Sequence, residues 1–175
     1  AIGGFIAYQT MVADMIKMGV KIDQHAELSD FNITMVSENG GALARYLQSE
    51  TTLKEQQFQL DYIADNPMTY ETDSVEYHND NMPEGFWYPP EYETRTVNKT
   101  DSNRPKILWF RDSFGRLVAP HLIRNFGYTT EIFDAWQYRL NEEIIKKEKP
   151  DVVVTLILER NLKCLMTGGN CEGNF

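Results

Sequence analysis

The sequence predicts an α/β protein with a mostly parallel sheet covered by helices, and three observations support this prediction. An apolar stripe at three- and four-residue steps runs through residues 4–18, which is typical of an amphipathic helix. Two nearly unbroken apolar runs, at 106–110 and 151–158, have the length and composition of strands buried on both faces. Between these runs the pattern predicts a helix, a strand and another helix, an order that calls for parallel strands.

The first elements are predicted from local signals in the amino-terminal half. Gly19 is expected to end the first helix, and alternating apolar and polar residues over 31–36 predict a strand or extended segment. After the glycine pair at 40–41, residues 42–47 are expected to form a short helix. The glycine pair could bind an anion through free amide groups, but a simple turn is the favoured interpretation.

Residues 60–103 form a segment without clear periodicity that is acidic and rich in aromatic side chains. Because disordered linkers are poor in aromatics, we expect an ordered, irregular insertion of short strands or loops within a single domain of residues 1–175. Trp87 and Tyr88 in this insertion are candidates for stacking on sugar rings. The alternative is that they anchor a long loop to the core.

The carboxyl-terminal half carries sharper signals. We expect a strand at 106–110, a turn at 111–115, a helical run at 117–126 ended by Gly127, a strand at 129–133, a helix at 140–149 and a strand at 151–158. Ligands of such sheets collect at the carboxyl ends of the strands, so the turn at 111–115 is the expected site.

Composition limits the classes of partner. The 175 residues and 42% apolar content suit one domain, and no apolar run approaches the roughly 18–20 residues of a membrane span. The formal net charge is −9 and the basic residues are scattered, so nucleic acid is not expected as a partner. The sequence shows no metal-ligand spacing and no glycine-rich phosphate loop, and we predict neither a metal nor a cofactor.

Both ends of the sequence bear on its context. It starts at Ala1 without an initiator Met, and we expect it to be a piece of a longer protein. Cys164 and Cys171 either form a small loop disulfide, which would imply an oxidising compartment, or remain thiols.

Ser113 is the main catalytic candidate because it falls just after the predicted strand at 106–110. A serine at a strand-to-helix turn lies near unpaired amide groups and the positive end of the helix, which favour an oxyanion. Such a serine is well placed to attack an acyl carbon. The alternative is that Asp112 or Ser113 only caps the following helix, since both residue types are preferred caps.

The residues around this serine resemble those of a known enzyme class. The run Arg111-Asp112-Ser113-Phe114-Gly115 resembles the nucleophile block of the SGNH (GDSL-like) hydrolases, in which Asp-Ser follows the first strand. The wider chain resembles the alginate O-acetyltransferase-type proteins, also called the DHHW family, at residues 3–9, 41–47, 107–114, 120–122, 149–153 and 158–162. This resemblance implies a three-layer SGNH-like domain that is incomplete at its amino end. The resemblance does not extend to the aromatic insertion.

The resemblance also implies a function. It implies transfer of an acyl group, typically acetyl, to or from a carbohydrate hydroxyl in the periplasm, at the cell surface or outside the cell. Ser113 would carry the acyl group, and the partners would be an acyl donor, the carbohydrate and a membrane protein that delivers the acyl group. In this family the Asp and His of the triad lie in an Asp-x-His-Trp motif just before the helix that matches residues 3–18. We therefore expect both residues in sequence that precedes Ala1.

The remaining polar candidates have weaker assignments. His25, His78 and His121 do not match the family's motif, and a surface or packing role is favoured for each, with His78 the best alternative base. Two further sets of residues each have two possible roles. An oxyanion pocket could be shaped by Arg111, Asp112 and Gly115, or these residues could simply support the turn. Reacting groups could be oriented by Glu159 and Arg160, or these two could form an ion pair.

Two other functions compete with acyl transfer. One is a non-catalytic glycan-binding or assembly domain on the same fold that uses the region of Trp87 and Tyr88. The other is a flavodoxin-like nucleotide binder, which the lack of a phosphate-cradling loop argues against.

Overall fold

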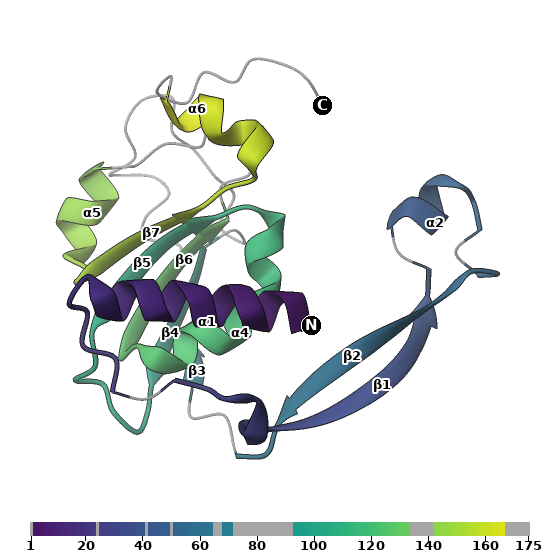
Figure 1. Ribbon diagram of the computed structural model, residues 1–175. Helices are drawn as coiled ribbons and strands as arrows, with labels where there is room; N and C mark the ends of the chain where they lie inside the picture. The colour runs from purple at the N-terminus through teal and green to yellow at the C-terminus, as the bar shows by residue number, and fades with distance from the viewer. Residues whose placement is uncertain are drawn as a thin grey trace.

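The computed structural model of the protein describes residues 2–23, 25–40, 42–49, 51–64, 68–71, 93–133 and 142–166. Side chains at 42, 43, 68–71, 160, 164 and 165 are outside this description. Figure 1 shows that these parts form a body built on a sheet, with a two-stranded arm that extends from it.

The body contains a five-stranded sheet with the strand order β3-β4-β6-β5-β7. Its strands are β3 (Met68–Glu71), β4 (Glu93–Asn98), β5 (Lys106–Arg111), β6 (Tyr128–Phe133) and β7 (Val152–Leu156). β5 is parallel to both of its neighbours, β6 and β7, whereas β4 is antiparallel to β6 and β3 is antiparallel to β4. The prediction of a mostly parallel sheet is therefore right for the last three strands and wrong for the first two, and the sheet is mixed.

The two antiparallel strands come from the segment 60–103, for which the sequence predicts an irregular insertion of short strands or loops. β3 and β4 are short strands within it, and they extend the sheet at one side. β4 has the sequence Glu-Thr-Arg-Thr-Val-Asn, so no apolar run marks it as a strand. Its ladder partner β6 lies about 35 residues later in the chain, and an antiparallel edge on a parallel sheet is a common arrangement.

Helices border the sheet and the loops that leave it. They are α1 (Ile2–Lys17), α4 (Ala119–Leu122), α5 (Glu142–Glu148) and α6 (Leu162–Met166), with short 3₁₀ helices η1 (Leu28–Asp30), η4 (Ser113–Leu117), η5 (Ile123–Asn125) and η6 (Glu159–Asn161). The helical run expected after Ser113 is thus divided into η4, α4 and η5. Pro120 lies at the start of α4, where its missing amide hydrogen costs little.

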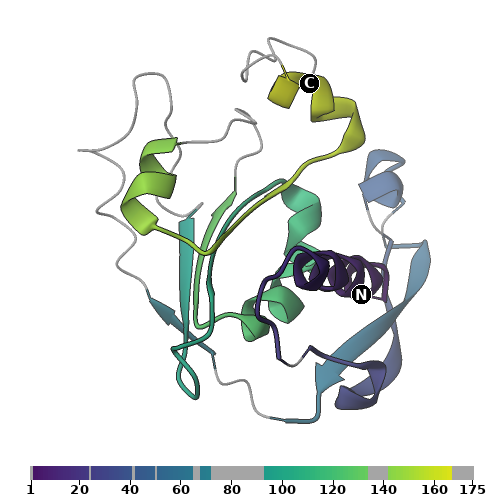
Figure 2. The same cartoon turned by 60° about the vertical axis from the view of Figure 1, so that its left-hand side comes forward.

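β5 lies inside the sheet, and its four central side chains are almost completely buried. Ile107 and Trp109 belong to the core beneath α1, while Leu108 and Phe110 belong to the core on the α5 side. Successive residues of a strand point to opposite faces, so burial on both faces requires the unbroken apolar run that the sequence shows. Helices accordingly lie on both sides of the sheet, as Figure 2 shows.

The end of α1 confirms the predicted role of Gly19. This glycine has a φ of 91°, in the left-handed region that a side chain disfavours. The amide of Val20 donates to the carbonyl of Met15 at 3.0 Å, which closes the last turn of the helix. The predicted first helix is therefore confirmed, with its stop signal.

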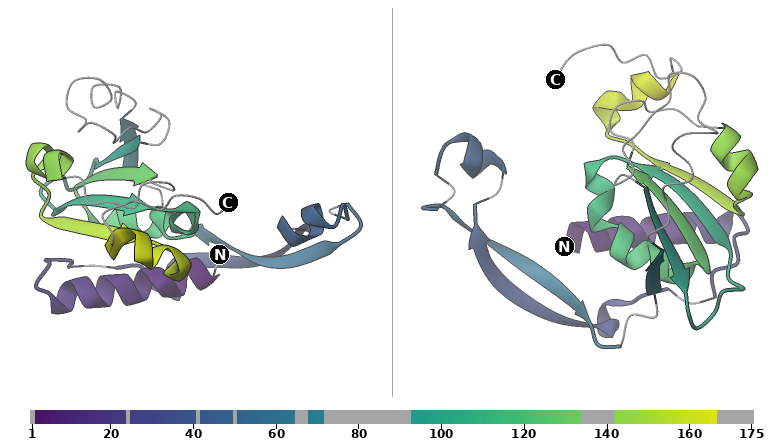
Figure 3. Two further views of the ribbon diagram at one scale, coloured as in Figure 1. Left: turned by 90° about the horizontal axis from the view of Figure 1, so that it is seen from above. Right: turned by 180° about the vertical axis from the view of Figure 1, so that it is seen from behind.

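The arm consists of β1 (Phe31–Asn39) and β2 (Lys54–Tyr62), paired antiparallel in a separate sheet, with α2 (Ala42–Tyr46) between them in the chain. Figures 1 and 3 show the arm extending away from the body. Its base is fixed by Phe31 and Tyr62, whose ring centroids lie 4.2 Å apart and which pack against the core. The predicted extended segment and short helix are confirmed, but the sequence did not indicate that they form an arm.

Within the described ranges, no helix combines the length and the hydrophobicity that crossing a membrane requires.

Candidate functional site

Ser113 lies at the carboxyl end of an interior strand. β5 ends at Arg111, and Ser113 begins η4 two residues later. Both neighbours of β5 are parallel to it, so the carboxyl ends of three strands meet at this edge of the sheet. The turn therefore occupies the position where ligands of parallel sheets collect.

Asp112 holds the turn in place through both of its carboxylate oxygens. Oδ1 accepts a hydrogen bond from the Phe114 amide at 2.8 Å, and Oδ2 accepts one from the Leu158 amide at 2.8 Å. The Asp112 amide also donates to the Leu156 carbonyl at 3.2 Å. With 3% of its surface exposed, Asp112 caps η4 and joins the end of β5 to the end of β7.

Ser113 itself is not used for capping. Its side chain is exposed, and neither its hydroxyl nor its amide has a hydrogen-bond partner in the part of the chain that the structure describes. Of the two residues that could have capped the helix, Asp112 does so. The hydroxyl of Ser113 is thus available for chemistry, and its amide is available to a developing oxyanion.

Arg111 supports the turn through contacts with Glu131 and with the backbone. Its guanidinium contacts one Glu131 oxygen, from Nε at 2.6 Å and from Nη2 at 2.5 Å, and Nη1 donates to the Asp112 carbonyl at 3.1 Å. Burial raises the pKa of Glu131, although the Arg111 charge acts in the opposite direction. Gly115 lies over this side chain, because a Cβ there would be 2.7 Å from the Arg111 Cβ.

A mostly apolar hollow of about 500 Å³ lies beside the serine turn. Its walls come from the first turns of α1, from η4 and from the residues after β7. Asp112 and Phe114, the two neighbours of Ser113, both line it, and Phe114 is 58% exposed. Gly4 lets α1 approach η4 closely, since a Cβ there would lie 2.4 Å from the Leu117 carbonyl oxygen.

The other predicted site residues are distributed differently. Glu159 is exposed and lines the same hollow, whereas the Arg160 side chain lies outside the described part. Trp87, Tyr88 and His78 also fall outside the described residues, and so do the two cysteine side chains. Among described residues, no group of three His, Cys, Asp or Glu side chains could hold a metal ion.

Neither described histidine lines the hollow beside Ser113. His25 is exposed and pairs with Glu27 at 3.1 Å. His121 is buried among aromatic rings, and its Nδ1 lies 3.1 Å from the Tyr62 hydroxyl. Burial lowers the pKa of His121 to about 4, with a smaller contribution from the charge of Arg124. It is a neutral packing residue at pH 7.

Sequence reasoning missed three features of this site. It did not pair Arg111 with Glu131, it did not connect Asp112 to the Leu158 amide, and it did not place Gly4 against η4. All three depend on contacts between distant parts of the chain. Only Gly4 had a local signal, since a glycine inside a helix often marks a close approach.

Comparison with known proteins adds information on the fold. No protein-family model and no curated protein matches the chain. A structure of Bacillus cereus PatB1 with a sulfonyl adduct is similar, with a TM-score of 0.61, 15% identity, and coverage of 91% of this chain and 57% of that chain. A further structure of Bacillus cereus PatB1 has a TM-score of 0.57, 15% identity, and coverage of 91% and 59%.

A DHHW family protein from Eubacterium siraeum is also similar, with a TM-score of 0.55, 16% identity, and coverage of 87% of this chain and 55% of that chain. The chain therefore spans less than two thirds of the length of each of these proteins. At this level of identity the comparison establishes the fold, which this chain shares with PatB1 and with a DHHW family protein.

Proposed function

We propose that this chain carries the nucleophile of an enzyme that transfers an acyl group, typically acetyl, to or from a carbohydrate hydroxyl outside the cytoplasm. One observation carries the proposal: Ser113 is exposed, and its hydroxyl has no partner in the described part of the chain, at the carboxyl end of an interior parallel strand. A serine needed only as a cap would be bonded to the helix backbone, and Asp112 already performs that role.

The chemistry follows the two steps of covalent catalysis. The Ser113 Oγ attacks the carbonyl carbon of the donor and gives its proton to a base, which passes it to the leaving group as the donor bond breaks. The acceptor hydroxyl then attacks the acyl-serine, its proton returns through the base to Ser113, and the new ester leaves. The free Ser113 amide would stabilise the oxyanion of both tetrahedral states.

The base is proposed to lie upstream of the helix that begins at Ile2. The resemblance places an Asp and a His just before the helix that matches residues 3–18. In the structure Gly3 and Gly4, at the start of that helix, line the hollow beside Asp112 and Phe114. A residue placed shortly before Gly3 would therefore be close to this hollow.

The comparisons support this proposal at the level of the fold. A DHHW family protein is among the similar structures. PatB1 was solved with a sulfonyl adduct, and a sulfonyl group is what a sulfonylating reagent transfers to a nucleophilic side chain. The carbohydrate acceptor, the acyl donor and the location outside the cytoplasm rest on the sequence resemblance.

The direct test is covalent labelling of the protein extended at its amino end by its natural upstream sequence. We expect phenylmethanesulfonyl fluoride to form one adduct, which peptide mass spectrometry places on Ser113. Ser113→Ala should abolish the adduct, whereas Ser102→Ala, a change at an exposed serine just before β5, should leave it unchanged. An extended protein that folds but forms no adduct at Ser113 would favour the glycan-binding alternative.

A further inference from the structure

A second set of polar residues gathers at the opposite edge of the sheet. Arg104 precedes β5, and Arg124 and Asn125 form the end of η5, just before β6. These positions are at the amino ends of parallel strands, while Ser113 follows the carboxyl end of β5. The six residues of β5 separate the two edges by about 20 Å at ~3.3 Å per residue.

The Arg124 guanidinium lies over an aromatic ring at this edge. The carbon centre of its guanidinium is 3.3 Å from the ring centroid of Tyr62, which ends β2 of the arm. Stacking uses the face of the guanidinium and leaves the N–H donors in its plane free. No Asp or Glu of the described ranges lies within 4 Å of this group.

The charge of Arg124 is therefore only partly compensated. Removal of this group from water lowers the pKa of Arg124, and the nearby Tyr62 and Tyr8 act in the opposite direction. A partly buried cation without a carboxylate is a costly arrangement, and a bound anion would offset that cost.

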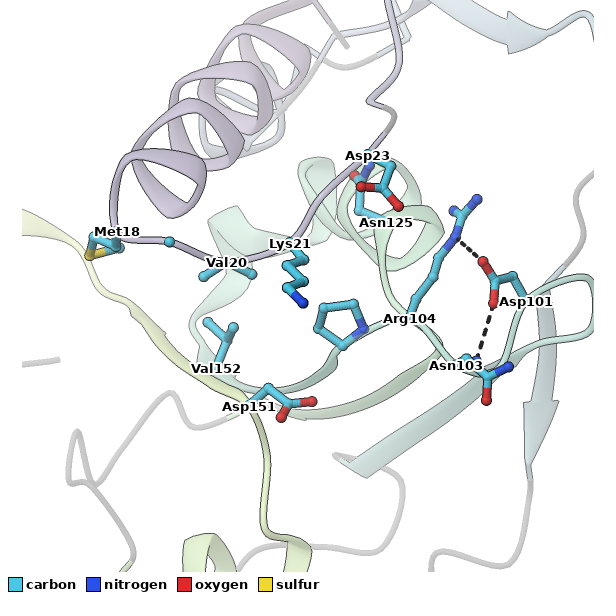
Figure 4. Close-up of a pocket in the computed structure, with 12 residues that line it drawn as sticks. Met18, Val20, Lys21, Asp23, Asp101, Asn103, Arg104, Asn125, Asp151 and Val152 are labelled. Atoms are coloured by element: carbon cyan, nitrogen blue, oxygen red, sulfur yellow. Dashed lines mark hydrogen bonds and ion pairs between the residues drawn. The ribbon is translucent and has the colours of Figure 1, made fainter.

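Arg104 brings a second guanidinium to the same place. Its Nη1 donates to the backbone carbonyl of Arg124 at 2.8 Å, and its Nε contacts Asp101 at 3.3 Å. These contacts fix the side chain, and Nη2 forms no hydrogen bond or ion pair with the described residues. Figure 4 shows Arg104 held beside Asp101 at the border of a neighbouring hollow of about 680 Å³, with Asn125 close by.

The two arginines line a further hollow of about 520 Å³ at the base of the arm. Tyr8, Tyr62 and Ile63 provide much of its apolar wall. Asp30 also lines the hollow, but its carboxylate accepts a hydrogen bond from the Glu27 amide and lies more than 4 Å from both guanidinium groups. The volume falls within the usual range for small-molecule sites.

We propose that this hollow binds the oxyanion of a small organic molecule, a carboxylate or a phosphate ester. Arg124 would bind two oxygens of the group through the edge of its guanidinium, and Nη2 of Arg104 would add a third donor. The body of the ligand would lie along Tyr62 and Ile63. The site is separate from Ser113, and its existence does not depend on the proposed acyl transfer.

The test measures ligand binding to residues 1–175. The four probes are acetate, glucuronate, inorganic phosphate and glucose 1-phosphate, with glucose as the neutral control. We expect at least one anion to shift the backbone amide NMR signals of Tyr62 and Asn125, and glucose to shift none. Binding by the carboxylates alone or by the phosphates alone would identify the source of the oxyanion. Its affinity should fall as salt is added, because the attraction is between charges.

Variants sharpen the test. Arg124→Gln should weaken binding about tenfold or more, since a hydrogen bond to a charged group contributes about 1.5–3 kcal/mol. Arg124→Lys should give an intermediate affinity, because the charge remains but the two-pronged geometry is lost. Arg45→Gln removes an exposed arginine from α2 on the arm and should change nothing.

Two results would overturn the proposal. One is the absence of any shift at Tyr62 and Asn125 in the unaltered protein with all four anions at millimolar concentration. The other is equal affinity in the unaltered protein and in Arg124→Gln. Because the first result needs no variant, a failure of Arg124→Gln to fold would not leave the question open.

Discussion

The two edges of the sheet present opposite kinds of reactive group. At the carboxyl edge, Arg111 pairs with Glu131 and Asp112 accepts hydrogen bonds from backbone amides, whereas the uncharged hydroxyl of Ser113 has no hydrogen-bond partner among the described residues. At the amino edge, Arg104 contacts Asp101 and a carbonyl, and no carboxylate of the described residues pairs with the charged Arg124.

The comparison shows that a residue which forms hydrogen bonds or ion pairs can hold the local backbone while an adjacent side chain remains available to a ligand. An engaged charge costs little and orients the chain around it, so the free group beside it is held in place. A free hydroxyl suits attack on a neutral carbonyl, whereas a free guanidinium suits the binding of an anion. Four predictions test this contrast.

The largest expected effect is the loss of hydrolysis rate when the proposed general base is absent. Hydrolysis of p-nitrophenyl acetate by residues 1–175 should proceed at no more than about 10⁻³ of the rate of the version extended by its upstream sequence. Loss of a general base removes most of the function of a triad and leaves the oxyanion donors. Steady-state rates at neutral pH measure the ratio. Equal rates would place the base within residues 1–175, with His78 as the candidate.

Removal of the Asp112 carboxylate should destabilise the carboxyl edge strongly. Asp112→Ala leaves the amides of Phe114 and Leu158 without their acceptors, and we expect a loss of about 3–4 kcal/mol in the free energy of unfolding. Urea unfolding followed by circular dichroism measures this change. Asp14→Ala, which removes only an exposed ion pair with Lys17, is the control and should have no measurable effect. Equal losses in both variants would mean that Asp112 does not hold the turn.

At the amino edge, we expect the free energy of unfolding to depend on pH because His121 changes its protonation state. Its pKa is about 4 in the folded protein and about 6.5 when unfolded, so the folded state binds fewer protons between these values. The stability that comes from neutral His121 is complete above pH 6.5 and is lost as the pH falls towards 4. We expect this loss to be about 3 kcal/mol.

Unfolding in urea at pH 7 and pH 4 checks the contribution of His121. His121→Gln keeps a polar group near the Tyr62 hydroxyl but cannot be protonated, so the variant should lose about 3 kcal/mol less than the unaltered protein over this interval. Contributions from acidic groups cancel in the comparison. If both proteins lose stability equally, His121 is not the buried neutral group described here.

The smallest expected effect on stability comes from adding a methyl group to the serine turn. Gly115→Ala forces a Cβ to 2.7 Å from the Arg111 Cβ, and we expect a loss of about 1–2 kcal/mol. Thermal unfolding measures the loss. Gly3→Ala is the matched control, because its Cβ would meet nothing within 4 Å and alanine favours a helix, so this change should be neutral or slightly stabilising. A neutral Gly115→Ala would show that the turn is loosely packed.

Much of the body was predictable because its signals are local. Residues 106–110 read as a strand and Gly19 as the end of a helix, and the structure confirms both. The position of Ser113 after that strand was predictable for the same reason. β4 was not predictable, because its polar residues are stabilised by pairing with β6 and not by a pattern of their own.

The sequence by itself determined the interior strand β5, the serine that follows it and the order of the elements from β5 to β7, because apolar periodicity and turn residues act within a few positions. Only the tertiary structure decided that Asp112 caps the turn while Ser113 stays free, that Arg111 pairs with Glu131, and that Arg124 lies on Tyr62. These choices join residues up to 62 positions apart in the chain. Hydrogen bonds and ion pairs have no sequence period, so their partners are chosen only when the folded chain brings them within reach.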